Sequence, residues 1–189
     1  MLAPEARARL LRIARAALVA GSRTDAGPAF LAADAGPPAA EAPPAHGGAF
    51  VTLRIDGQLR GCVGRVESDR PLDETVRDVA RAAAGEDPRF PALRPAELAH
   101  VVIEVSVLGA LEPCAGPDAL IAGRHGVLVE QGGRRGLLLP QVAVEQGWSA
   151  SACVAQACVK AGLRPDAWRR GAALFRFEAE VFEEDCRRR

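Results

Sequence analysis

One short segment concentrates residue types that could bind a ligand or carry out catalysis. From Leu59 to Gly64 the chain reads LRGCVG, so a lone cysteine, Cys62, lies two residues after Arg60 and close to two glycines. Gly61 and Gly64 can adopt backbone angles closed to other residues and let a ligand approach the main chain closely. Arg60 is a permanent cation that would favour the nucleophilic thiolate form of Cys62. The segment therefore predicts a binding or catalytic site, with a simple packing role for the cysteine as the alternative.

A thiol nucleophile usually needs a base, and the sequence offers several candidates. His125, in GRHGV between two loop-forming glycines, is expected to face a cleft, with an exposed turn histidine as the alternative. His46 falls in a Pro/Gly-rich connection and His100 begins a strand, so both are weaker candidates. Lys160 is the only lysine of an arginine-rich chain, and it would either carry a proton or complement the dipole at a helix end.

Two further segments predict ligand contacts. The turn DPRFP would pair Asp87 with Arg89, either as part of a binding site or as a structural turn in which Phe90 fills the core. Pro140 follows a strand and opens a helix, and the free N–H groups of a helix start can bind an anion. Gln141 would then be a polar group beside such a pocket.

Composition bounds the class of protein. A chain of 189 residues with 49% hydrophobic and 25% charged residues is expected to form a single globular domain over residues 1–189. Lys plus Arg equals Asp plus Glu at 24 each, so the sequence shows no electrostatic footprint for nucleic acid or an anionic membrane. No apolar run approaches the ~20 residues of a membrane span, and arginines interrupt the first helix pattern, unlike a signal peptide. We therefore expect a cytoplasmic protein.

The five cysteines do not predict a metal site. Cys153 and Cys158 would point about 140° apart on a helix, at roughly 100° per residue, and could not share an ion. Cys114 falls in a Gly/Pro loop and Cys186 in a charged tail, and no CxxC pair occurs. We expect free thiols, with no intrinsic metal and no bound cofactor.

Residue periodicity predicts an α+β fold, with a mostly antiparallel sheet flanked by helices. Helices are expected over residues 4–20, 71–85, 140–147 and 149–162. Strands are expected over residues 50–55, 58–66, 100–108, 126–131, 134–139 and 174–182, with hairpin turns at residues 56–57 and 132–133. Residues 22–48, rich in Pro, Gly and Ala, are expected to form an exposed connection.

Five motifs in order, RGCVG, DPRFP, RHG, LLPQVAVEQGW and CVKAGL, resemble the AMMECR-type domain family. The resemblance covers about Leu10 to Phe182. The central motif of the family is usually written LRGCIG, where this chain has Val63 for the isoleucine; Ala92 replaces a second proline of the family turn. The resemblance implies an α+β fold with a larger and a smaller lobe, and motif residues gathered near a groove between them.

The resemblance implies no established biochemical activity. Prokaryotic members are often encoded beside a Memo-like protein and a radical-SAM protein, which implies these two as partners in a shared pathway. Two hypotheses stay open. The protein is an enzyme, or a component of an enzyme system, with Cys62 as nucleophile, or it is a non-catalytic adaptor or small-molecule-binding module that uses the same groove through Arg60 and Gln141.

Overall fold

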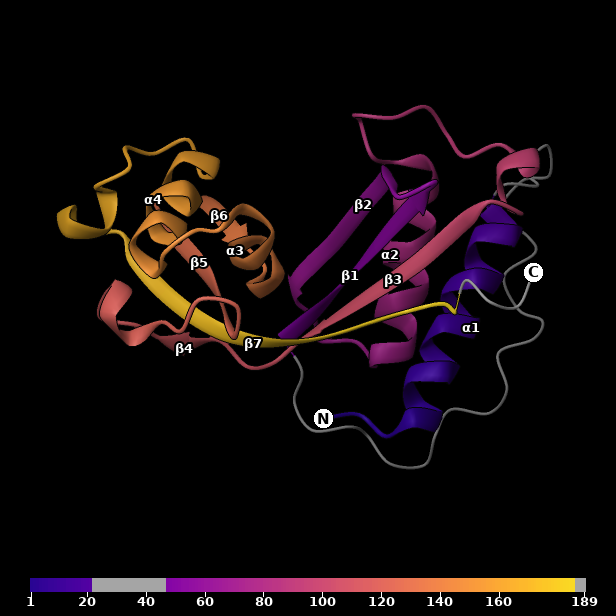
Figure 1. Ribbon diagram of the computed structural model, residues 1–189, viewed down its shortest axis with the longest axis horizontal. Helices are drawn as coiled ribbons and strands as arrows, with labels where there is room; N and C mark the ends of the chain where they lie inside the picture. The colour runs from indigo at the N-terminus through magenta and orange to yellow at the C-terminus, as the bar shows by residue number, and fades with distance from the viewer. Residues whose placement is uncertain (22–46, 186–189) are drawn as a thin grey trace. The chain divides into compact units, whose positions relative to one another are not determined.

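The computed structural model describes residues 1–21 and 47–185. Four α-helices and seven strands with antiparallel pairings make up this part of the chain (Figure 1), which confirms the α+β prediction. The helices are α1 (Pro4–Gly21), α2 (Leu72–Gly85), α3 (Pro140–Gln146) and α4 (Ala150–Lys160). The strands are β1 (Gly47–Ile55), β2 (Gln58–Glu67), β3 (Val101–Leu108), β4 (Glu112–Pro113), β5 (His125–Gln131), β6 (Arg134–Leu138) and β7 (Ala173–Glu183).

The chain divides into two compact units. Residues Met1–Val107 with Glu180–Arg189 form the first unit, and Leu108–Ala179 form the second. The strand order is β2-β1-β3-β7-β5-β6, and β4 pairs with β7. Strand β2 is therefore at one edge of the sheet. Most of the connection expected at residues 22–48 lies outside the described residues, and its last two glycines begin β1.

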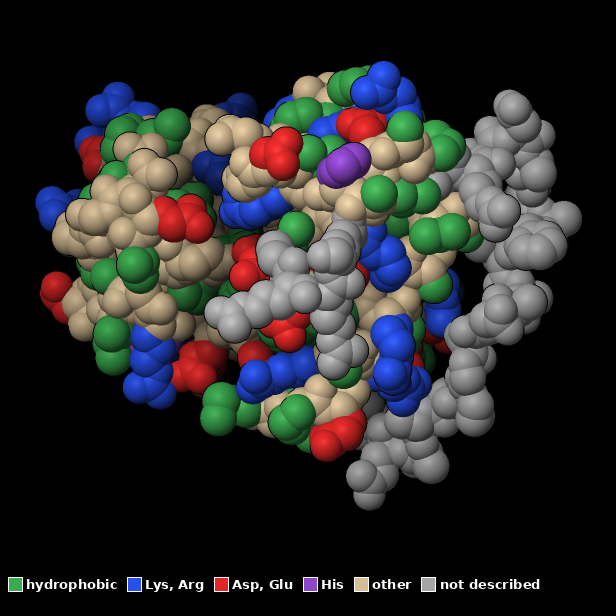
Figure 2. Space-filling model, turned by 45° about the vertical axis from the view of Figure 1, so that its right-hand side comes forward, with side chains coloured by type: hydrophobic (Ala, Val, Ile, Leu, Met, Phe, Trp, Pro, Cys, Tyr) green, Lys and Arg blue, Asp and Glu red, His purple; other side chains and the backbone are tan. Residues whose placement is uncertain are grey.

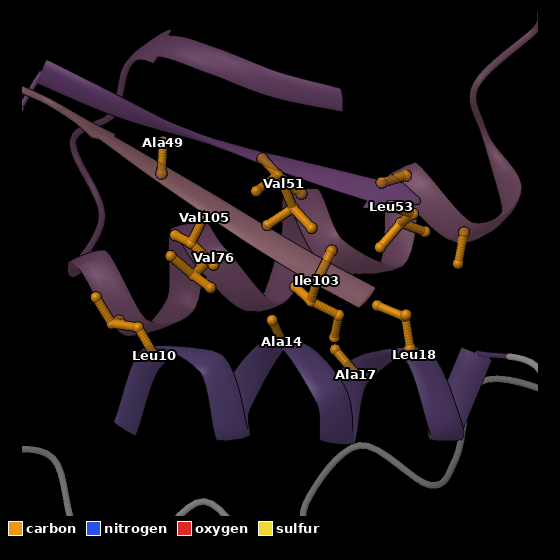
Figure 3. Close-up of a cluster of buried hydrophobic side chains, with 14 of the residues drawn as sticks. Leu10, Ala14, Ala17, Leu18, Ala49, Val51, Leu53, Val76, Ile103 and Val105 are labelled. Atoms are coloured by element: carbon orange, nitrogen blue, oxygen red, sulfur yellow. The ribbon is translucent and has the colours of Figure 1, made fainter. Parts of the chain in front are cut away.

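The first unit is built on two helices that pack against one sheet face. Along α1, Leu10, Ala14 and Leu18 recur every four residues, so they form one apolar stripe. Figure 3 shows this stripe facing Val76 of α2 and Ile103 of β3, and all five side chains are buried. Burial of each large apolar side chain stabilises the fold by about 1.5–3 kcal/mol. This cluster fixes the strands that carry the LRGCVG segment.

A tight turn and a bulge set the register of β1 and β2. Asp56 and Gly57 both have positive φ angles, 50° and 76°, as a two-residue hairpin turn requires. The pairing then shifts between Leu53 and Arg54, because β2 contributes one extra residue there. Beyond the bulge, Thr52 lies opposite Cys62.

The two glycines of LRGCVG serve close packing. Neither has a positive φ angle, so neither uses the conformational freedom that glycine offers. A Cβ atom on Gly61 would lie 2.3 Å from the carbonyl oxygen of Ala83 in α2. A Cβ atom on Gly64 would lie 2.1 Å from the ring of Phe50. Glycine is needed at both positions because α2 and an aromatic ring occupy the space of a side chain.

The second unit has its own apolar cluster around α4 and the β5–β6 hairpin. Gly132 and Gly133, at φ angles of 59° and 77°, make the expected hairpin turn. Ser149 caps α4, because its hydroxyl accepts a hydrogen bond from the backbone N–H of Ala152 at 3.3 Å. Cys158 is fully buried in the cluster, which agrees with a packing role. The two-residue strand β4 was not predicted, since so short a strand leaves no periodic pattern.

Charges of both signs are mixed on the face of the molecule that Figure 2 shows. Figure 2 shows Lys and Arg side chains next to Asp and Glu side chains, rather than separate fields of one sign. Within residues 1–21 and 47–185, no helix combines the length and the apolar composition that crossing a membrane requires.

Candidate functional site

Cys62 lies half-buried on β2, in contact with polar groups on three sides. Its backbone N–H donates to Oδ2 of Asp87 at 2.8 Å, and its carbonyl accepts from Nη2 of Arg89 at 3.2 Å. The hydroxyl of Thr52, on the neighbouring strand, donates to its sulfur at 3.5 Å. Asp87 and Arg89 thus hold the backbone of Cys62, whereas Thr52 contacts the thiol itself.

The Asp87–Arg89 ion pair expected from DPRFP is present. Arg89 donates from Nε to Oδ1 at 2.9 Å and from Nη2 to Oδ2 at 2.7 Å. The Asp87 side chain is only 3% exposed, whereas that of Arg89 is 55% exposed. The hydrogen bond from Arg89 holds the pKa of Asp87 far below its usual range, even though burial acts in the opposite direction. Asp87 is therefore an ionised carboxylate that fixes one side of an accessible guanidinium.

The same turn occupies the outer edge of β2. Asp87 and Arg89 take the N–H and the C=O of Cys62, as a neighbouring strand would. We had expected Phe90 to fill the core, and this is wrong. Phe90 is half-buried, and the Arg89 guanidinium lies 5.5 Å from its ring centroid. The buried apolar residue of this turn is Leu93, which is 5% exposed.

Arg60 holds the chain that follows the turn. It donates from Nε to Glu97 at 2.9 Å, and from Nη1 and Nη2 to the carbonyls of Pro91 and Ala92 at 2.8 and 3.2 Å. The hydrogen bond from Arg60 is the main reason why the pKa of Glu97 is lowered to about 2, against the effect of burial. The cation in contact with Cys62 is Arg89, where the sequence had suggested Arg60.

Sequence reasoning missed Thr52 and Glu97 as partners of the site. Thr52 could have been found from the hairpin only if the bulge in β2 had been recognised, since the bulge decides which residue faces Cys62. Glu97 lies in a single 3₁₀ turn, Pro95–Glu97, and its carboxylate accepts from the backbone N–H and the Nε of Arg94. Nothing in its local pattern connects it to Arg60, 37 positions away in sequence.

His125 begins β5 and holds the preceding turn together. The backbone N–H of Ile121 donates to its Nδ1 at 3.0 Å. An Nδ1 that accepts carries no proton, so this hydrogen bond requires the neutral ring with its proton on Nε2. Burial, followed by the positive charges of Arg176 and Arg124, lowers the pKa of His125 below its usual value. This geometry favours the turn interpretation, and a role as proton carrier stays a prediction.

The His125 turn should make stability depend on pH. The folded protein favours the neutral ring, so the unfolded chain binds more protons and folding weakens as the pH falls below about 6.5. We expect His125→Asn, which keeps an acceptor but does not titrate, to flatten the loss of stability between about pH 7 and 5. Urea unfolding of both proteins across this range checks it. Parallel curves for the two proteins would contradict the prediction.

The other predicted residues of the second unit have structural contacts as well. Lys160, in the last turn of α4, donates from Nζ to the carbonyl of Leu137 at 2.8 Å. Pro140 is buried at the start of α3, which has only seven residues, and Gln141 next to it is half-buried. The candidate residues thus form two sets, one in each unit. The set of the first unit, Cys62, Asp87 and Arg89, is joined by direct hydrogen bonds.

Metal ligation finds no support in the described ranges. Residues 1–21 and 47–185 contain no group of three or more His, Cys, Asp or Glu that could hold an ion. Burial raises the pKa values of Cys153 and Cys158, so both stay protonated and are poor ligands and nucleophiles. Cys114 donates to the carbonyl of Gly116 at 3.1 Å, and Cys186 lies outside the described residues.

Known proteins with similar sequences cover most of the chain. The family model described as AMMECR1 matches residues 11–182. A protein of Thermofilum pendens is 47% identical over 154 residues, which is 72% of each chain. Protein MK0488 of Methanopyrus kandleri is 47% identical over 148 residues, covering 73% of this chain and 72% of that one. The crystal structure of the uncharacterized protein PH0010 from Pyrococcus horikoshii is similar, with a TM-score of 0.80 and 38% identity, covering 93% of this chain and 90% of the other.

Proposed function

The chain belongs to the AMMECR1 family, and on this premise we propose that it is an enzyme, or a component of an enzyme system, whose reactive group is the Cys62 thiol. One observation carries the proposal: an accessible guanidinium, that of Arg89, hydrogen-bonds to the backbone carbonyl of Cys62, whose side chain is half-buried. The hydrogen bond to Asp87 is the main cause that raises the pKa of Arg89, and the Cys62 sulfur acts in the same direction. A fixed cation beside a thiol can hold an anionic substrate within reach of a sulfur nucleophile.

The accessible part of Arg89 also indicates the kind of substrate. Asp87 accepts from Nε and Nη2, and the Cys62 carbonyl accepts from Nη2 as well. Nη1 has no acceptor within residues 1–21 and 47–185, and the Arg89 side chain is 55% exposed. A guanidinium N–H forms charge-assisted hydrogen bonds with carboxylates and phosphates. We infer an anionic substrate, held by Arg89 so that an electrophilic carbon comes within reach of the Cys62 sulfur.

Alkylation by two reagents of different charge tests the thiol and the cation together. Iodoacetate is an anion and iodoacetamide is neutral, so their rate ratio at one cysteine reports the local positive charge. We expect this ratio to be several-fold higher at Cys62 than at half-buried Cys114, and to fall in Arg89→Gln but less in Arg89→Lys. Rates at single cysteines are measured by mass spectrometry of peptides. Equal ratios at the two cysteines, or an Arg89→Gln variant with an unchanged ratio, would contradict the proposal.

A second candidate function rests on a different observation. Both backbone groups of Cys62 are hydrogen-bonded to the DPRFP turn, as expected if the residue has a structural role. The protein would then be a non-catalytic adaptor or small-molecule-binding module, with Arg89 as a contact. Cys62→Ser separates the two functions. An enzyme loses pathway activity with its melting temperature unchanged, whereas a binding module keeps most of its affinity.

The partners inferred from the family resemblance, a Memo-like protein and a radical-SAM protein, belong to the same proposal. Co-purification of tagged wild-type protein with each of them, compared with Cys62→Ser, tests whether either partner binds and whether binding needs the thiol.

A further inference from the structure

The outer edge of β2 has hydrogen-bond partners at Cys62 but not at Gly64, the next residue whose backbone groups point the same way. In an antiparallel pair, alternate residues direct their N–H and C=O groups to the partner strand and away from it. Cys62 directs both groups away from β1, to Asp87 and Arg89. Gly64 is two residues further along and lies opposite Phe50 in the same ladder, so it directs its N–H and C=O to the same outer edge. Within residues 1–21 and 47–185, no side chain or turn hydrogen-bonds to these two groups, so another chain could reach them.

A groove runs along this open edge. It is a hollow of about 210 Å³ between β2 and α2, which we call the β2–α2 groove. Val63, Val79 and Ala82 supply its apolar lining. Ala82 of α2 has only a methyl side chain, which leaves room beside Gly64. An edge strand with a groove beside it is the arrangement in which an extended peptide can add a strand and bury alternate side chains.

The charges at the groove favour an acidic occupant. Arg65 and Arg81 line it and are exposed, and neither makes an ion pair within residues 1–21 and 47–185. Of the two carboxylates that line it, Asp78 is already paired with Arg70. Glu86 is the remaining one, so two arginines face one uncompensated carboxylate.

We propose that the β2–α2 groove binds an extended, acidic peptide segment of a partner protein by strand addition at Gly64. The backbone of the peptide hydrogen-bonds to the N–H and C=O of Gly64. Its apolar side chains contact Val63, Val79 and Ala82, and its carboxylates pair with Arg65 and Arg81. This site uses none of the groups of the Cys62 site, and it does not depend on the proposed thiol chemistry.

Fluorescence anisotropy with model peptides tests the proposal. The probes are two labelled peptides of equal length with alternating valine, one with glutamate and one with lysine at the other positions. We expect the glutamate peptide to bind more tightly than the lysine peptide, and Arg65→Glu with Arg81→Glu to weaken it at least ~10-fold. Arg12→Glu, an exposed charge reversal on α1, is the matched control and should leave affinity unchanged.

Backbone methylation of the peptide tests strand addition itself. Methyl groups on the amides that face Gly64 should abolish binding, whereas the same number on the alternate amides should be tolerated. Hydrogen exchange gives an independent readout: the Gly64 amide should exchange faster than that of Val63, which pairs with Val51, and become protected when the peptide binds. Melting curves confirm that each variant is folded.

Four results would overturn the proposal. They are no binding of the glutamate peptide up to its solubility limit, equal binding of the lysine peptide, no effect of the arginine variants, and no difference between the two methylated peptides. Analytical sedimentation of the protein alone tests whether a second copy of this chain occupies the groove instead. A dimer that Arg65→Glu dissociates would assign the edge to a second copy of this chain and overturn the peptide proposal too.

Discussion

Replacement of Asp87 by alanine is expected to lower the free energy of unfolding by about 2–4 kcal/mol, the range for loss of hydrogen bonds to a buried, ion-paired carboxylate. Asp87 accepts from the backbone N–H of Cys62 and from both the backbone and the guanidinium of Arg89. Alanine removes all of these acceptors at once. Chemical denaturation at neutral pH measures the change.

The pH dependence distinguishes a lost ion pair from a general packing defect. The pKa of Asp87 is depressed in the folded protein, so its stabilisation is present above the ordinary value of 3.8 and declines as the pH falls below it. The difference between wild type and Asp87→Ala should therefore shrink on acidification. Asp87→Asn, which keeps one acceptor oxygen, should lie between the two. A difference that stays constant down to acid pH would mean that charge has little part in it.

Gly61→Ala is expected to cost about 1–3 kcal/mol, the usual range for overpacking a core. The added Cβ would lie 2.3 Å from the carbonyl oxygen of Ala83, which is helix backbone and cannot rotate away. Either α2 shifts or the end of β2 does, and Cys62 is the next residue. We therefore also expect a change in the alkylation rate of Cys62, measured in the same samples.

Gly85→Ala is the matched control for Gly61→Ala. Gly85 is the last residue of α2, and a Cβ atom there would meet nothing within 4 Å. Its unfolding free energy should stay within about 0.5 kcal/mol of wild type, as for most surface substitutions. Equal losses in the two variants would show that the contact with α2 does not cause the effect, because loss of glycine backbone entropy by itself stabilises the fold.

The strands and helices could be predicted because each repeats its apolar residues with a clear period. The face of the sheet on which the Cys62 side chain lies could not be predicted. A two-residue turn at Asp56 and Gly57, continued without interruption, pairs Cys62 with Val51 of the buried face. The extra residue in β2 moves the pairing by one, so that Cys62 lies opposite the hydroxyl of Thr52 instead. A bulge has no reliable signal in a single sequence, and it decided the surroundings of the thiol.

The sequence predicted which residues form the candidate site, but not all of their hydrogen-bond partners. Asp87 with Arg89 was predicted because two residues in a proline turn cannot separate far. Arg60 was assigned to Cys62 on the same ground of closeness in sequence, and wrongly, because an arginine side chain is long enough to reach Glu97 and two carbonyls of another segment. Long, flexible cations are the residues whose partners sequence proximity predicts least well.

The DPRFP turn also bears on how the protein behaves at high concentration. An uncovered edge strand is a template on which other molecules can stack into aggregates. Here the carboxylate of Asp87 and the guanidinium of Arg89 take the backbone N–H and C=O of Cys62. Unlike a strand, this ion pair offers no new edge to which a further chain could add. Variants that lose Asp87 or Arg89 should consequently become less soluble before they unfold. Light scattering during concentration would then register the damage earlier than any thermal melt.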